Sequence, residues 1–212
     1  MQEKTNGRGD ILSSLKRIAY ELKRHAPFTA LGAFTGIILM GIAILIGLSS
    51  ESSHTIFHVL HPAHIVLSAL VTTAIYRRYG GGIGAAVGIG FVGSIAICST
   101  SDIVFPYIGG VLLGLPITLH VCFIEHTWLI TLSALAGIAI GLLWPHTRFP
   151  HAGHVLLSTY ASLFYFATFG APADWAPLLP LVFPILFVAV WIPCCVSDVV
   201  FPLLFVRKKK HR

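Results

Sequence analysis

The sequence contains few charged residues. Only 10% of its 212 residues are Asp, Glu, Lys or Arg, whereas 56% are hydrophobic. A soluble globular domain carries about 25% charged residues, so this composition excludes an ordinary soluble protein and is typical of a polytopic membrane protein. Cysteine is also scarce, with four residues in the chain. All four fall within apolar segments, which argues against a disulfide framework.

Six apolar segments approach the length of a membrane-spanning helix, which is roughly 20 residues. They are Phe28–Ser49, His61–Tyr76, Ile83–Pro106, Ile117–Trp144, His151–Gly170 and Pro177–Val206. The second is the shortest when its start is placed beside Pro62. We therefore predict an all-α polytopic membrane protein with six transmembrane helices.

The basic residues predict the orientation of these helices. The 14 Lys and Arg residues occupy the N-terminal 24 residues, Arg77-Arg78, Arg148 and the C-terminal tail. With six spans, all of these regions lie on one side of the membrane, and the opposite loops carry only Glu51 and Asp174 as charges. The positive-inside rule then places both termini in the cytosol, for a protein of the cytoplasmic membrane. The net charge of +6 reflects this topology and contact with anionic lipid, which argues against nucleic-acid binding.

The N-terminal segment predicts a separate surface helix. Ile11, Leu15, Ile18 and Leu22 share one helical face of the segment Asp10–His25, and its basic residues lie elsewhere. This pattern is typical of a basic amphipathic helix on the inner leaflet.

Two phrases of the sequence occur twice. Cys98–Pro106 (CSTSDIVFP) returns as Cys194–Pro202 (CCVSDVVFP), and His61–Ser68 returns as His151–Ser158. Each copy contains three spans, an odd number, so the second copy must be inverted relative to the first. Inverted repeats are a recurring plan of secondary transporters. The predicted units are a cytosolic N-terminal segment (1–26), the first repeat (27–116), the inverted second repeat (117–206) and a basic cytosolic tail (207–212).

Each repeat places an aspartate, Asp102 or Asp198, inside a predicted span. Such a group costs at least ~2.5 kcal/mol at membrane depth, so it faces a cavity, a partner charge or an ion. The proline that follows each aspartate lacks a backbone donor, which predicts a local break in the helix. The residues of these breaks are Ser101, Pro106, Ser197 and Pro202.

Two further features concern the third span. Gly84 and Gly88 have the small-xxx-small spacing that lets helices approach closely. The tract Tyr107–Pro116 that follows fits either a re-entrant hairpin or an apolar loop.

The 11 histidines gather at the ends of the predicted spans, near the aspartates. A His-x-x-His pair supplies two imidazoles to one metal, a carboxylate supplies a third ligand, and a thiolate favours a soft or borderline ion. We predict a site for Zn²⁺, Mn²⁺, Fe²⁺, Co²⁺ or Ni²⁺ in each repeat, near the outer leaflet in the first and near the inner leaflet in the second. The predicted ligands are His61, His64, Asp102 and Cys98 in the first repeat, and His151, His154, Asp198 and Cys194 in the second.

Span four carries polar residues without a counterpart in span one. Cys122 and His126 are four apart, with Glu125 beside them. This asymmetry indicates either that the outer site has more ligands than the inner one or that a proton relay lies next to it. The residues predicted as a relay or as extra ligands are His54, His58, His120, Glu125, His126 and His146. Purely structural roles are the alternative to metal binding. The histidines would then lie at the level of the lipid headgroups, and the Ser-Asp pair would cap a broken helix.

These features predict a small secondary transporter for a divalent transition metal or a metal-linked substrate, rather than an enzyme. The two pseudo-symmetric sites would alternate in access, with protons coupled through the aspartates or histidines. The expected partners are the lipid bilayer and the ion or substrate, and the sequence is compatible with a homo-oligomer. Two alternatives stay open: an integral-membrane metalloenzyme acting on a lipid or other apolar substrate, and a b-type haem electron conduit.

Overall fold

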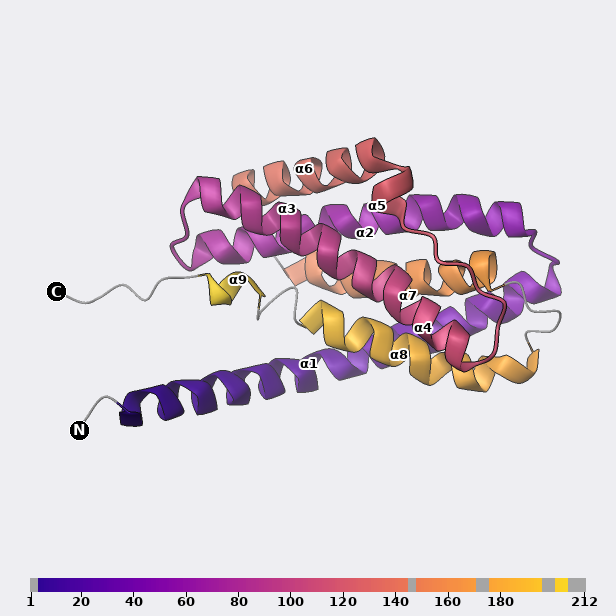
Figure 1. The fold of residues 1–212 in the computed structure, drawn as a ribbon, viewed down its shortest axis with the longest axis horizontal. Coiled ribbons are helices and arrows are strands. Elements are labelled where there is room, and N and C mark those ends of the chain that lie inside the picture. The colour runs from indigo at the N-terminus through magenta and orange to yellow at the C-terminus, as the bar shows by residue number, and fades with distance from the viewer. Residues whose placement is uncertain (1–3, 145–147, 171–175, 196–200, 206–212) are drawn as a thin grey trace.

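The computed structural model describes residues 4–144, 148–170, 176–195 and 201–205 (Figure 1). Its described part contains helices, turns and irregular segments but no strand, so the predicted all-α class is confirmed there. The helices are α1 (Lys4–Leu45), α2 (Ser50–Arg78), α3 (Ile83–Ser99), the π-helical turn η1 (Thr100–Val104), α4 (Phe105–Leu112), α5 (Cys122–Glu125), α6 (Thr127–Leu143), α7 (Arg148–Phe169), the 3-10 turn η2 (Ala176–Leu178), α8 (Leu179–Cys195) and α9 (Phe201–Leu204).

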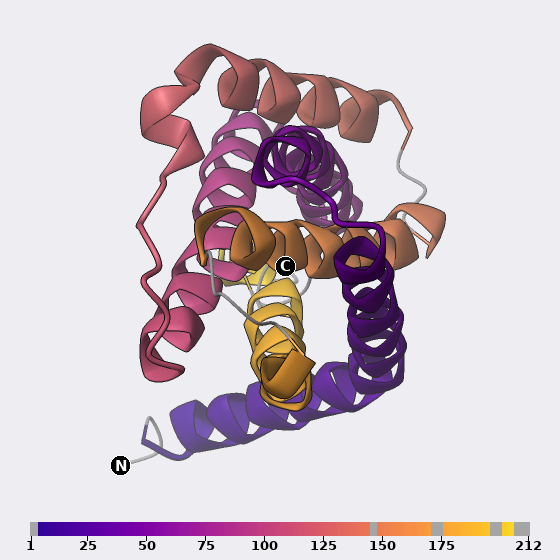
Figure 2. The same ribbon diagram turned by 90° about the vertical axis from the view of Figure 1, so that its right-hand side faces the viewer.

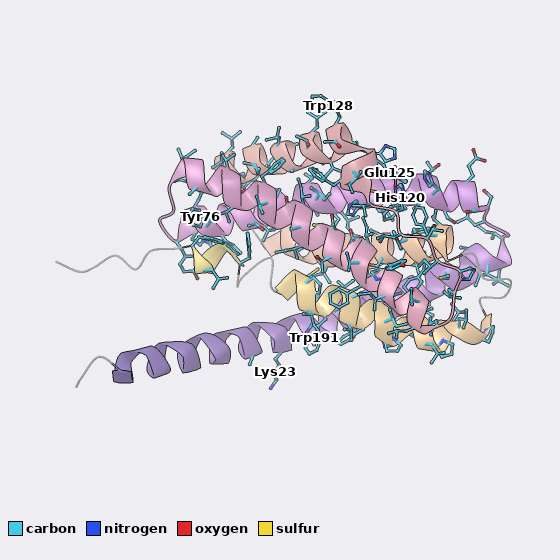
Figure 3. The ribbon with its side chains drawn as sticks, viewed as in Figure 1. Lys23, Tyr76, His120, Glu125, Trp128 and Trp191 are labelled. Carbon is cyan, nitrogen blue, oxygen red and sulfur yellow. The ribbon has the colours of Figure 1, made fainter. Side chains whose placement is uncertain are left out.

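Among the described residues, three helical stretches are long and apolar enough to cross a membrane. They are Ala26–Leu45 within α1, Ser50–Arg78 and Ile83–Leu112. The apolar helices α6 and α8 have 17 residues each and are shorter than a full span. Large apolar side chains cover the outside of the bundle, for example Trp128, which is 80% exposed and points away from it (Figure 3). Such a surface suits contact with lipid and not with water.

The helix α2 begins eleven residues before the start predicted at His61. Ser49 caps it, because its side chain accepts a hydrogen bond from the backbone N–H of Ser52 at 3.1 Å. Pro62 lies inside the helix without ending it. The predicted start of the second span at His61 was therefore wrong. His64 lies fourteen residues after Ser50, which is about 21 Å along the helix at 1.5 Å per residue.

The predicted break at Ser101–Pro106 is a widened turn in a continuous helix. The N–H of Phe105 donates to the carbonyl of Thr100, five residues back, and α4 continues to Leu112. Pro106 has no N–H to donate, so one backbone bond is missing at this place. The tract Tyr107–Pro116 is thus neither a hairpin nor a loop in its first half. It remains helical until the turn at Gly114, whose φ is +70°.

The helix in the predicted fourth span, Ile117–Trp144, is shorter than that span. The residues before Cys122 are irregular, and α6 begins at Thr127. The irregular backbone is satisfied by α7, because the hydroxyl of Tyr165 accepts from the N–H of His120 at 3.0 Å and donates to the carbonyl of Thr118 at 3.2 Å. Irregular backbone at membrane depth is tolerated when protein groups satisfy it in this way.

The helix α1 joins the predicted surface helix to the first span. It runs through Pro27 without interruption, so the expected boundary between residues 26 and 27 is not a break in the helix. Its N-terminal part extends beyond the bundle (Figure 1).

The helix α2 lies at the centre of the bundle and packs against α7, α6 and α3. On the other side, α7 lies between α2 and α8, and α1 packs against both α7 and α8 (Figure 2). A Cβ added at Gly141 of α6 would lie 2.6 Å from the carbonyl oxygen of Leu70, so this glycine lets α6 approach the backbone of α2. Gly84 and Gly88, by contrast, face open space, and the close approach predicted for them was wrong.

Candidate functional site

Asp102 lies at the centre of a fully buried polar network. Its Oδ2 accepts hydrogen bonds from Nδ1 of His61 at 2.8 Å and from Nδ1 of His64 at 2.7 Å. Its Oδ1 accepts from the hydroxyls of Ser101 at 2.7 Å and Ser158 at 3.0 Å. The carboxylate therefore receives four donors, which compensates the cost of burying its charge.

Three helices supply this network. The helix α2 contributes the two histidines, which share a helical face because they are three residues apart. The turn η1 contributes Ser101 and Asp102, and a π-helical turn of this kind is frequent at functional sites. The helix α7 contributes Ser158 and also Ser162, whose hydroxyl donates to the carbonyl of Ser101 at 3.0 Å.

A second buried group adjoins the first through His64. The ligand atoms of His64, His154 and Cys194 lie within 4.8 Å of one another. The rings of His64 and His154 stack with their centroids 4.5 Å apart. Since Nδ1 of His64 faces Asp102, its Nε2 faces this second group, and Sγ of Cys98 lies 3.6 Å from that nitrogen. The carboxylate thus orients the imidazole, as the outer partners of metal-binding histidines do.

The structure does not keep the residues of the two predicted sites apart, so their predicted separation was wrong. His64 comes from the first repeat, whereas His154 and Cys194 come from the second, and these three buried side chains lie together. Cys98 of the first repeat lies beside His64. The reason is that α2 starts early, which moves its histidines from the end of the span into its interior, where α7 packs against it.

The structure gives a partial account of the other predicted ligands. It brings His61, His64 and Asp102 together. His146, Asp198 and Ser197 and the side chain of His151 lie outside the described residues. The buried His/Asp/Cys groups could hold a metal ion, and whether they do so stays a prediction.

Most of the residues predicted as a relay or as extra ligands gather near the start of α2. We call His54, His58, His120, Glu125 and His126 the outer cluster, because as a group they are more exposed than the buried groups. The ligand atoms of His58, His120 and His126 lie within 4.8 Å of one another. His54 stacks on His58 with ring centroids 4.1 Å apart. The Oε1 atom of Glu125 lies 2.8 Å from Nδ1 of His120, an ion-pair distance. Figure 3 shows these two residues near each other beside α5.

Sequence reasoning missed the side chains that support both groups. Ser158 was visible in the repeated phrase as the counterpart of Ser68, yet its hydroxyl was not assigned to Asp102. Phe57 lies between the two groups, stacked on His61 at 5.5 Å and edge-on to His58 at 5.2 Å. Nothing in the sequence singles out Phe57 except its place between histidines on α2.

Comparison with known protein families, curated proteins and solved structures finds no match for this chain.

Proposed function

We propose that the protein is a small secondary transporter for a divalent transition-metal ion, acting in the cytoplasmic membrane with both termini in the cytosol. One observation carries this proposal: His64 of the first repeat and His154 and Cys194 of the second have ligand atoms within 4.8 Å of one another at a buried place. An ion held there would be bound by both halves of the molecule. A movement of one half against the other would therefore change the access to the ion.

The packing of the helices supports six spans arranged as two inverted repeats. In this scheme α1 corresponds to α6, α2 to α7, and α3 to α8. The helix α6 packs on α2 and α3, and in the same way α1 packs on α7 and α8. The corresponding helices α2 and α7 pack on each other, as expected of elements beside a pseudo-two-fold axis.

Two glycine pairs support the same correspondence. A Cβ at Gly32 of α1 would lie 2.9 Å from the hydroxyl of Thr159 on α7. A Cβ at Gly137 of α6 would lie 2.8 Å from Cβ of Ala69 on α2. In the repeated phrases Thr159 and Ala69 follow the matching serines Ser158 and Ser68, so equivalent helices meet at equivalent places. In both helices a second glycine follows four residues later.

The chemistry of the buried ligands favours a borderline ion. Imidazole nitrogen suits Zn²⁺, Fe²⁺, Co²⁺ and Ni²⁺, and thiolate adds selectivity for softer ions such as Zn²⁺. Ligands must lose their protons when the metal binds, so binding and release exchange metal for protons. Asp102 orients His64 and accepts its Nδ1 proton in a hydrogen bond, and the repeat gives Asp198 the corresponding role toward His154.

The test is Zn²⁺ uptake into liposomes that contain the purified protein and a Zn²⁺-sensitive dye. We expect uptake by the wild type, loss of uptake in Cys194→Ser, and retained uptake in the matched control Cys122→Ser, since Cys122 is also buried but belongs to neither buried group. Metal that binds without any uptake would contradict transport and favour the metalloenzyme alternative.

A further inference from the structure

The outer cluster brings Nε2 of His58 to 3.2 Å from Nε2 of His120. Nδ1 of His58 lies 2.9 Å from the carbonyl oxygen of His54, and a carbonyl can only accept. Nδ1 of His120 lies 2.8 Å from the carboxylate of Glu125, which also accepts. In their neutral forms both rings therefore carry the proton on Nδ1, a tautomer inferred from these partners. Their Nε2 atoms, 3.2 Å apart, then present two lone pairs to each other.

Two facing lone pairs repel unless a cation lies between or beside them. The thiol of Cys122, 3.8 Å from Nε2 of His58, is a weak donor and serves only one of the two nitrogens. A shared proton or a metal ion would satisfy both. His126 adds a third imidazole, since its ring centroid lies 4.8 Å from that of His58 and its ligand atom lies within 4.8 Å of the other two.

The burial of the cluster suits the capture of an ion from outside. His120 is 8% exposed, His58 is half-buried and His126 is exposed. Three protein ligands leave one coordination position of a tetrahedral ion open. Water, or a ligand from the molecule that delivers the ion, can occupy this position. Glu125 fixes the orientation of His120 in the way that carboxylates support metal-binding histidines.

The outer cluster and the buried groups follow each other along one face of α2. His54, His58, His61 and His64 follow each other at intervals of three or four residues, which places them on one helical face. The fully buried ring of Phe57 contacts both His58 and His61, so it separates the outer cluster from the inner one.

We propose that His58, His120 and His126 form a second metal site, distinct from the buried one, that captures a borderline divalent cation such as Zn²⁺ or Co²⁺ at this end of the bundle. Its ligands are all nitrogen, with Glu125 as the positioning carboxylate. The site stands on its own geometry and does not depend on the proposed transport.

The test is a titration of the full-length protein in detergent with Co²⁺, followed by absorption. A site with a cysteine ligand gives a thiolate-to-Co²⁺ charge-transfer band in the near ultraviolet, whereas an all-nitrogen site gives only the weaker visible bands. We use Cys122→Ser as the background, so that no thiol lies beside the outer cluster. We expect this protein to bind one equivalent of Co²⁺ that adds nothing to the charge-transfer band, besides the equivalent with that band that the buried group binds.

In this background, His126→Ala should lose the equivalent that adds nothing to the charge-transfer band. His126 is exposed, so its removal leaves the core unchanged, and His126→Gln keeps the size of the side chain as a second variant. The matched control is His54→Ala, because the ring of His54 stacks on His58 but is not among the three ligands, and the variant keeps the backbone carbonyl that lies beside His58. It should bind as the background does.

Two results would overturn the site. In the first, all of the bound Co²⁺ contributes to the charge-transfer band. In the second, His126→Ala and His126→Gln both bind as much Co²⁺ as His54→Ala does. Failure of the buried site is distinguishable from these results. In that case no variant shows the charge-transfer band. One equivalent of Co²⁺ without a thiolate ligand still binds and still requires His126, and this outcome supports the outer site.

Discussion

The imidazole rings of His64 and His154 stack with their centroids 4.5 Å apart and their planes inclined by 27°. The two residues occupy matching places in the repeated phrases of the sequence, on α2 and on α7. The stacking therefore joins the two halves of the chain at the residues that both halves retain. Under the proposed mechanism, any movement between α2 and α7 changes the spacing of these two ligands.

Packing between α6 and α2 gives the first prediction. In Gly137→Ala the new methyl group would overlap the carbonyl oxygen of Val66, so α6 must move away from α2. We expect a loss of about 1–3 kcal/mol in the free energy of unfolding, as for other overpacked sites. Gly84→Ala is the matched control, because that position faces open space. Thermal unfolding in detergent compares the two, and equal melting temperatures would contradict the close approach.

The irregular segment before α5 gives the second prediction. In Tyr165→Phe the N–H of His120 and the carbonyl of Thr118 lose their shared partner at a buried position. An unsatisfied buried group costs about 1–3 kcal/mol, so we expect a destabilisation of at least that size. Tyr160→Phe serves as the control, since Tyr160 makes one half-buried side-chain bond, to Thr35 at 3.1 Å. Its effect in chemical denaturation should be smaller, and the reverse order would refute the role given to Tyr165.

Sequence patterns identified the residues of the buried groups but not their arrangement. The repeated His-x-x-His and Ser-Asp phrases placed His61 and His64 with Asp102, because both phrases fell at the same predicted depth. Depth along a span says nothing of how two helices cross, and the contact of His64 with His154 depends on the packing of α2 on α7. Two separate sites were therefore predicted where the structure has adjoining ones.

The ends of the helices were harder to predict than their existence. The segment Ser50–Leu60 is rich in Ser and His and was not counted as apolar, although Ser49 caps a helix there. Pro106 was expected to break a helix, but a five-residue hydrogen bond accommodates it. The spacing of Gly84 and Gly88 matched a packing motif as well as that of Gly137 and Gly141 did. Only tertiary contacts distinguish the pair that faces a helix from the pair that does not.

The four donors on Asp102 give the last prediction. Asparagine has the shape of aspartate, but its amide nitrogen cannot accept a hydrogen bond. In Asp102→Asn the amide nitrogen must therefore face either the two histidines or the two serines, and one pair of donors loses its acceptor. Breaking a buried charged network costs about 3–5 kcal/mol, so we expect a strongly lowered melting temperature.

The matched control for Asp102→Asn is Ser158→Ala, which removes one neutral donor and leaves the carboxylate three others. Its cost should be about 0.5–1.5 kcal/mol. Metal binding separates the two variants further. Without the carboxylate, Nδ1 of His64 is no longer oriented, so the affinity of the buried group for Co²⁺ should fall by about 10- to 100-fold in Asp102→Asn, as for other lost outer partners. Ser158→Ala should retain most of it. If Asp102→Asn instead melts and binds Co²⁺ as the wild type does, the charge of Asp102 contributes neither to the fold nor to the site.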